Sequence, residues 1–278
     1  MARVLVTGST GQLGADLCRE LVAKGHQVIG FDRTYDVGQV RIIYEGLCEA
    51  SPELVIHCAA LTNVDACEFN PSEAVRINVQ GTDNVAAYCS IVDIPMIFIS
   101  TDQVFSGSQN DSWGDKFFYR EGSNTAPVNI YGMTKLLAER IVQQKVKKHF
   151  ILRTAWLYGS SKNNYVNYYR DLSHKKLLVP DCQGNPTSTL ALSEMISKLI
   201  DKMPESGVYN AVCGGAVYKY SLARFLNPKA KIIQVEPGAG APRPRDTDLS
   251  NAKLSAIIGR IPTWQEALEQ YIGASIGK

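Results

Sequence analysis

The chain has 278 residues, 29 basic and 27 acidic side chains, a formal net charge of +2 and seven cysteines. The near-neutral balance, without runs of like charge, argues against nucleic acid or a membrane surface as the main partner. The cysteines are odd in number and form no Cys-x-x-Cys pair, and no apolar stretch approaches the ~20 residues of a membrane span. We therefore expect a cytoplasmic protein that acts on a small molecule.

The first elements predict a nucleotide-binding βαβ unit. A β-branched run over residues 3–7 indicates a strand, which ends in a turn containing Gly8, Gly11 and Gly14. An apolar repeat at helical spacing follows, and then a second strand over 27–32. Small residues in such a turn let a pyrophosphate approach the backbone and the positive end of the helix. The motif therefore predicts dinucleotide binding.

The end of the second predicted strand carries two residues that bear on the choice of cofactor. Asp32 lies 18 residues beyond Gly14, where a carboxylate accepts hydrogen bonds from the adenosine ribose and favours NAD. Arg33 follows directly and can instead pair with the 2′-phosphate of NADP. Both cofactors therefore remain open.

The remaining elements predict an α/β fold with a Rossmann-type, doubly wound parallel sheet. Strands and helices alternate as far as residue 157, so we expect a NAD(P)-binding domain over 1–157. Beyond it the alternation breaks down, which predicts a smaller, mainly substrate-binding portion over 158–278, interleaved with the first. The expected strands are 53–57, 96–101, 150–155, 177–180, 208–212 and 231–235, and the expected helices are 71–91, 131–147, 188–202 and 263–271.

Three residues predict acid chemistry at the sheet edge. Thr101 ends a predicted strand, where open α/β sheets bind ligands, and its hydroxyl can hydrogen-bond a carbonyl oxygen that gains charge. Tyr131 and Lys135 stand four residues apart in a predicted helix and share one face. The ammonium can therefore lower the phenol pKa from about 10 and let the phenol donate a proton near neutral pH.

Together these motifs resemble the extended short-chain dehydrogenases/reductases and, within them, the dTDP-4-dehydrorhamnose reductases. The resemblance extends over almost the whole chain. It implies that NADPH or NADH reduces a nucleotide-linked 4-keto-6-deoxy sugar, dTDP-4-dehydro-rhamnose to dTDP-rhamnose, for a surface polysaccharide or glycoconjugate. The matching segments are 6–14, 57–68, 100–107, 131–135, 152–159, 183–187 and 243–249.

The resemblance also implies a role for each matching residue. Tyr131 is expected to be the general acid, Lys135 to lower its pKa and hold the nicotinamide ribose, and Thr101 to bind the C4 oxygen of the sugar. Substrate contacts are expected from Asp102, Gln103 and Trp156. Cofactor contacts are expected from Gly8, Gly11, Gln12, Leu13 and Gly14 at the pyrophosphate, Asp32 and Arg33 at the ribose, Asp36 and Val37 at the adenine, and Ala59, Ala60 and Thr62 on the other side.

Three departures from the family pattern leave the identity of the sugar open, and one of them is Ala155, which replaces a frequent serine before Trp156. Gln103 stands where the family usually has tyrosine, which replaces a ring near the substrate by an amide. The segment 106–122 is several residues longer than usual. We expect a surface loop anchored by its own aromatic side chains rather than an active-site lid. These side chains are Trp113, Phe117, Phe118 and Tyr119.

Other functions remain as alternatives. One is a reductase or epimerase acting on a different nucleotide sugar. Another is an NADP-binding regulatory subunit similar to the β subunit of methionine adenosyltransferase, although such a subunit need not keep Thr101, Tyr131 and Lys135. The four histidines show no metal-ligand spacing, so no metal site is expected. A homodimer is possible.

Overall fold

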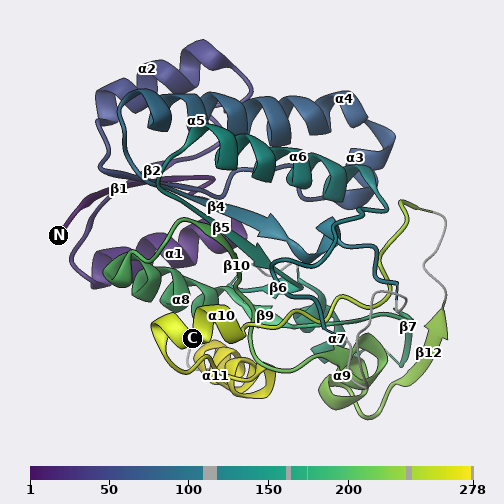
Figure 1. Ribbon diagram of the computed structural model, residues 1–278. Coiled ribbons are helices and arrows are strands. Elements are labelled where there is room, and N and C mark those ends of the chain that lie inside the picture. The colour runs from purple at the N-terminus through teal and green to yellow at the C-terminus, as the bar shows by residue number, and fades with distance from the viewer. Residues whose placement is uncertain (109–117, 161–163, 174, 236–239, 277–278) are drawn as a thin grey trace.

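The computed structural model describes residues 1–108, 118–160, 164–173, 175–235 and 240–276. Its centre is a six-stranded sheet with the order β10-β5-β4-β3-β1-β2, and every pair of neighbours in it is parallel (Figure 1). The strands are β1 (Arg3–Thr7), β2 (Gln27–Phe31), β3 (Leu54–His57), β4 (Met96–Thr101), β5 (His149–Thr154) and β10 (Gly207–Asn210).

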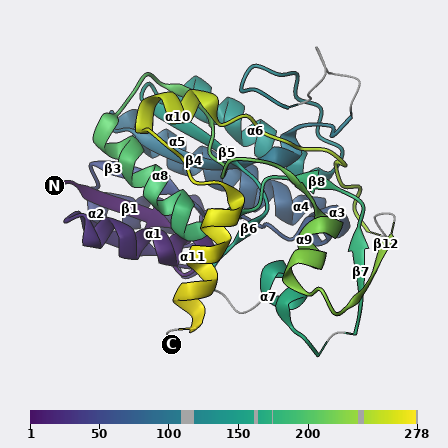
Figure 2. The same cartoon turned by 90° about the horizontal axis from the view of Figure 1, so that it is seen from below.

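Helices cover both faces of this sheet, because alternate residues of its strands are apolar on both sides. Val4 and Val6 of β1 point into one hydrophobic core and Leu5 into the other. This confirms the doubly wound α/β fold (Figures 1 and 2). One face carries α1 (Gln12–Ala23), α8 (Thr189–Lys202), α10 (Ala252–Ile258) and α11 (Trp264–Ile276), and the other carries α2 (Val40–Ala50), α5 (Gly81–Ile91) and α6 (Ile130–Lys145).

The helix expected over 71–91 is present as three consecutive pieces. It begins as α4 (Pro71–Ala74), passes through a π-helical segment η1 (Val75–Gln80) and continues as α5. A short helix α3 (Val64–Phe69) precedes it, and neither α3 nor α2 was expected from the sequence. The described residues contain no helix with the length and apolarity needed to cross a membrane.

The chain after residue 157 contributes to both parts of the molecule. The strand expected over 208–212 is β10, and it extends the central sheet beside β5 rather than lying in the smaller portion. Helix α8 likewise packs against α1. The smaller portion contains α7 (Tyr165–Arg170), α9 (Lys219–Leu226) and the strand pairs β7 (Lys176–Pro180) with β12 (Lys231–Val235), β8 (Gln183–Gly184) with β11 (Val217–Tyr218), and β6 (Leu157–Tyr158) with β9 (Thr187–Ser188).

Candidate active site

The glycine turn lies where the strand order reverses, because β2 flanks β1 on one side and β3 on the other. Open α/β sheets bind ligands at the carboxyl ends of strands at such a point. Gly8 has φ +65°, and a Cβ there would lie 2.9 Å from the backbone nitrogen of Ala59. A Cβ at Gly14 would lie 2.1 Å from the carbonyl oxygen of Gly8. Both positions therefore require glycine.

The start of α1 fits a pyrophosphate. Its N-cap, Gly11, offers no side chain, so the first amides of the helix are not capped from there. The Nε2 atom of Gln12 is buried and has no hydrogen-bond partner among the described residues. Leu13 packs its side chain into the core, so only its backbone can serve the cofactor. A bound anion would satisfy both the amides and Gln12.

Replacing Gly14 by alanine tests this turn. The added methyl group must displace the Gly8 backbone, so we expect unfolding at a lower temperature and loss of NADPH binding. Gly122→Ala is the matched control, since nothing lies within 4 Å of a Cβ there. Thermal unfolding and NADPH fluorescence titration measure both effects. Unchanged cofactor affinity in Gly14→Ala would contradict the assignment.

A fixed carboxylate, Asp32, follows the second strand at the position predicted to bind the adenosine ribose. Asp32 Oδ1 accepts hydrogen bonds from the backbone nitrogen of Thr34 (2.9 Å) and from its hydroxyl (2.7 Å). These bonds lower the pKa of Asp32 and hold its side chain as an exposed acceptor. Arg33 is exposed beside it.

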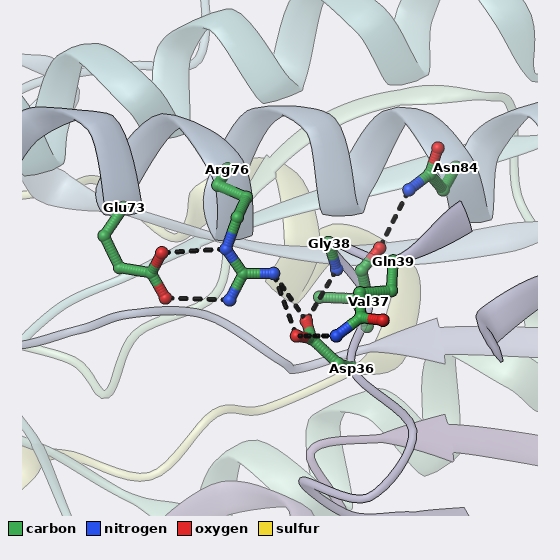
Figure 3. A network of polar contacts seen from close by, with 7 residues as sticks. All are labelled: Asp36, Val37, Gly38, Gln39, Glu73, Arg76 and Asn84. Carbon is green, nitrogen blue, oxygen red and sulfur yellow. Dashed lines mark hydrogen bonds and ion pairs between the residues drawn. The ribbon is translucent and has the colours of Figure 1, made fainter. Parts of the chain in front are cut away.

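Asp36 is the centre of a charge network beside this end of the crevice (Figure 3). Its carboxylate accepts two hydrogen bonds from Arg76 NH1, at 2.9 and 3.0 Å, and one from the backbone nitrogen of Gly38. Arg76 also donates to both oxygens of Glu73. Asp36 is therefore fixed before any ligand binds.

Val37 does not offer its side chain to the adenine. The side chain is 4% exposed and belongs to the core, while the carbonyl oxygen accepts a hydrogen bond from Asn84. A contact with the cofactor at this position would have to come from the backbone. On the other side of the crevice, Ala59 and Ala60 are half-buried and Thr62 is exposed.

His57 ends β3 behind the crevice as a buried, neutral ring. Thr7 Oγ1 lies 2.7 Å from Nδ1, and Thr82 Oγ1, which donates to the carbonyl of Asn78, lies 3.2 Å from Nε2. Since Thr82 must therefore accept from the ring, these contacts assign the proton to Nε2. Burial lowers the His57 pKa to about 3, with the nearby Lys135 charge adding to the effect.

The lowered pKa of His57 makes folding sensitive to acid. The unfolded chain binds a proton near pH 6.5 and the folded chain near pH 3, so stability falls as pH falls between these values. From pH 6.5 to 4.5 we expect His57 to remove about 2–3 kcal/mol from the free energy of unfolding. Urea unfolding at both pH values measures this loss of unfolding free energy. The His57→Gln variant has no ring to titrate, so it should not show the loss. Equal losses in both proteins would contradict it.

Thr101, Tyr131 and Lys135 come together at the carboxyl end of β4. Tyr131 and Lys135 lie on α6, whose N-cap Asn129 accepts from the backbone nitrogen of Gly132 (2.8 Å). The Thr101 hydroxyl lies close enough to the Tyr131 phenol to lower its pKa, against the larger effect of burial. Lys135 lies with its Nζ 4.0 Å from the centroid of the Phe98 ring. All three predicted catalytic side chains are thus buried side by side.

The pKa values in this trio are set by burial. Burial raises the pKa of Tyr131, and the Asp102 carboxylate raises it further, so the phenol is protonated at neutral pH and can act as an acid. Burial lowers the pKa of Lys135 to about 7, against the opposing charge of Glu139. The sequence predicted that the Lys135 charge lowers the Tyr131 pKa, and that effect stays a prediction.

A cavity of about 580 Å³ opens beside this trio, and its wall contains the three predicted substrate-contacting residues. Asp102 accepts from the hydroxyls of Thr101 (3.0 Å) and Thr247 (2.6 Å). Gln103 Oε1 accepts from Asn129 Nδ2 (2.8 Å), so the amide NH₂ of Gln103 is the group that remains for a ligand. Trp156 has a left-handed backbone (φ +43°), a strained conformation that is frequent at functional sites.

The ends of the long segment 106–122 are anchored by an aromatic residue, as expected. Tyr119 is buried, stacks on Phe105 with ring centroids 4.1 Å apart, and accepts from the backbone nitrogen of Gly107. Phe118 lies under the Arg120 guanidinium. The expectation for Trp113 and Phe117 falls on residues outside those described.

Comparison with known proteins agrees with this geometry. The family model described as RmlD substrate binding domain matches residues 2–276. A dTDP-4-dehydrorhamnose reductase of Mycolicibacterium smegmatis is 33% identical, over 99% of this chain and 86% of its own length. This chain belongs to the dTDP-4-dehydrorhamnose reductase family. It is therefore an NAD(P)-dependent oxidoreductase.

Two solved structures of this family superimpose closely on the chain. The dTDP-4-dehydrorhamnose reductase of Clostridium acetobutylicum has a TM-score of 0.90 at 34% identity, covering 98% of each chain. The reductase of Bacillus anthracis, solved in complex with NADP, has a TM-score of 0.89 at 33% identity, again covering 98% of each chain. Both likenesses extend beyond the Rossmann core to the smaller portion.

Several residues that shape the dTDP-4-dehydrorhamnose reductase site were not assigned from the sequence. Asn129 caps α6 and donates a hydrogen bond to Gln103. Asparagine is a frequent N-cap residue, so an Asn two residues before the predicted helix could have been recognised from the sequence. Thr247 holds Asp102 from a distance of 145 residues along the chain, a contact that no local pattern reveals. Lys219 lines the cavity from the start of α9.

Proposed function

We propose that this chain reduces the C4 carbonyl of a nucleotide-linked 4-keto-6-deoxy sugar, converting dTDP-4-dehydro-rhamnose to dTDP-rhamnose. The observation that carries the proposal is the buried group of Thr101, Tyr131 and Lys135 beside a cavity that Asp102, Gln103 and Trp156 help to line. Family membership supports the same reaction class, since relatives over the full chain are named for it.

A nicotinamide cofactor, when bound, would supply the hydride for the carbonyl carbon. Tyr131 donates its proton to the carbonyl oxygen, because its raised pKa keeps the phenol protonated at neutral pH. Thr101 orients that oxygen, and Asp102 fixes the Thr101 hydroxyl by accepting its hydrogen bond. Lys135, charged below about pH 7, holds the ribose and stabilises the negative charge left on Tyr131.

The cofactor is held along the glycine turn and the end of β2. Gly8, Gly11 and Gly14 with Gln12 would bind the pyrophosphate, and the fixed Asp32 carboxylate would accept from the adenosine ribose. Since Asp32 would repel a 2′-phosphate and Arg33 would attract one, both cofactors are expected to serve, with Asp32→Ala shifting the preference towards NADPH. Residues 158–278 mainly supply the substrate side of the site.

Oxidation of NADH and of NADPH by the purified chain, followed at 340 nm with dTDP-, UDP- and GDP-linked 4-keto-6-deoxy sugars, tests the proposal. We expect turnover with the dTDP-linked sugar. Turnover only with another nucleotide sugar would reassign the substrate. Cofactor binding without turnover of any sugar would support the regulatory-subunit alternative and overturn the enzyme.

A further inference from the structure

The cavity beside Thr101 contains one cation without a carboxylate partner. Among the described residues that line it, Arg243 pairs with Asp65 at 3.0 Å, and Asp102 is held by two threonine hydroxyls. Lys219 makes no salt bridge within the described part of the chain. Lys219 is therefore the lining cation that can pair with an anionic ligand, and its charge also lowers the pKa of the nearby Asp102, against the larger effect of burial.

Lys219 is held in place by its backbone but not at its ammonium group. It is the first residue of α9, and its backbone nitrogen donates to the carbonyl of Cys182 at 2.9 Å. Its Nζ lies 4.5 Å from the centroid of the Trp156 ring and 5.6 Å from that of Tyr165. Such a cation–π contact is weaker than a charge-assisted hydrogen bond to a phosphate oxygen.

Gly184 packs against the indole of Trp156. A Cβ at Gly184 would lie 2.7 Å from Trp156 Cε2, so the strand β8 contacts the ring directly. Trp156 and Lys219 both line the cavity, and the Lys219 ammonium lies over the ring. A ligand that stacks on this face of Trp156 must therefore displace the ammonium.

We propose that Lys219 binds the diphosphate of the nucleotide-sugar substrate, leaving the face of Trp156 as the ligand enters. The inference rests on the proposed function for the position of the sugar. With the sugar carbonyl at Thr101 and Tyr131, the diphosphate would extend into the cavity, whose wall includes Lys219 and the Arg243–Asp65 pair. Lys219 is a binding residue in this account and takes no part in proton transfer.

Calorimetric titration of dTDP into the protein tests the assignment without turnover. Lys219→Met keeps the aliphatic stem and removes the charge, and we expect it to weaken dTDP binding at least about tenfold. Lys219→Arg should restore most of the affinity. Lys229→Met, at an exposed position with the same charge change, is the control and should bind as wild type. Thermal unfolding of each variant shows whether it is folded.

Three further measurements separate a diphosphate contact from a structural role. Binding of thymidine, which has no phosphate, should be equal in wild type and Lys219→Met, and the salt dependence of dTDP binding should be weaker in the variant. In turnover, KM for the dTDP sugar should rise about tenfold with kcat changed less than about threefold. Wild-type dTDP affinity in Lys219→Met, equal loss of dTDP and thymidine, or no dTDP binding by wild type would each overturn the inference.

The outcome is independent of the proposed reaction. If dTDP binding depends on Lys219 but no 4-keto sugar is reduced, the diphosphate site stands and the reaction fails. If the sugar is reduced at wild-type KM by Lys219→Met, the reaction stands and the diphosphate assignment fails.

Discussion

Tyr131→Phe is expected to lower kcat for the keto sugar by about 10²–10⁴-fold, the range typical of a lost general acid. The buried phenol is the proposed proton donor of the site, and phenylalanine keeps its ring packing among Val64, Cys67 and Ala241. The affinities for NADPH and dTDP should therefore stay close to wild type. Steady-state rates and calorimetry measure these quantities.

Tyr168→Phe is the matched control for this change, because Tyr168 is half exposed on α7 outside the cavity. We expect its kcat to equal that of wild type. A Tyr131→Phe enzyme that keeps more than about a tenth of wild-type kcat would mean that another group protonates the oxygen.

Arg153→Met is expected to cost about 3–5 kcal/mol of unfolding free energy, because it leaves a buried carboxylate without its counter-charge. Arg153 donates to both oxygens of Glu139, at 2.9 and 2.7 Å, and both side chains are at most 5% exposed. Ser100 adds a hydrogen bond to the same carboxylate. This pair ties β5 to α6 one helical turn beyond Lys135.

Two comparisons isolate the buried pair in urea unfolding at pH 7.5. Arg41→Met breaks the exposed Arg41–Glu45 pair and should cost less than about 0.5 kcal/mol. Adding Glu139→Gln to Arg153→Met removes the isolated charge, so the double variant should be more stable than Arg153→Met alone. A loss below about 1 kcal/mol in Arg153→Met would show that the pair contributes little.

The sheet was predictable from sequence because β1, β3, β4 and β5 are buried along almost their whole length and read as short apolar runs. β4 is the clearest case, since all six of its residues are buried. The strand order near the edge was not predictable. β10 joins β5 across more than fifty residues of chain, and the pairing depends on packing that the local pattern does not contain.

For the site, the residue types in the sequence predicted which residues come together better than they predicted where each side chain points. The sequence placed Tyr131 and Lys135 on one helix face and Thr101 at a strand end, and their burial is an addition from the structure, while their catalytic roles stay a prediction. Leu13 and Val37 were expected at the cofactor, but their side chains point into the core, because an apolar side chain beside a ligand-binding turn gains more from burial. The pKa of Tyr131 depends on burial by distant segments, which spacing along a helix cannot report.

Isotope transfer tests the central claim most directly. The purified chain is incubated with dTDP-4-dehydro-rhamnose and NADPH that carries deuterium at both C4 positions of the nicotinamide, and the sugar product is analysed by mass spectrometry and NMR. The account predicts dTDP-rhamnose with one deuterium, bound at C4 of the sugar, and almost none formed by Tyr131→Phe in the same time. Unlabelled product, or deuterium at another carbon, would contradict hydride transfer to the carbonyl beside Thr101 and Tyr131.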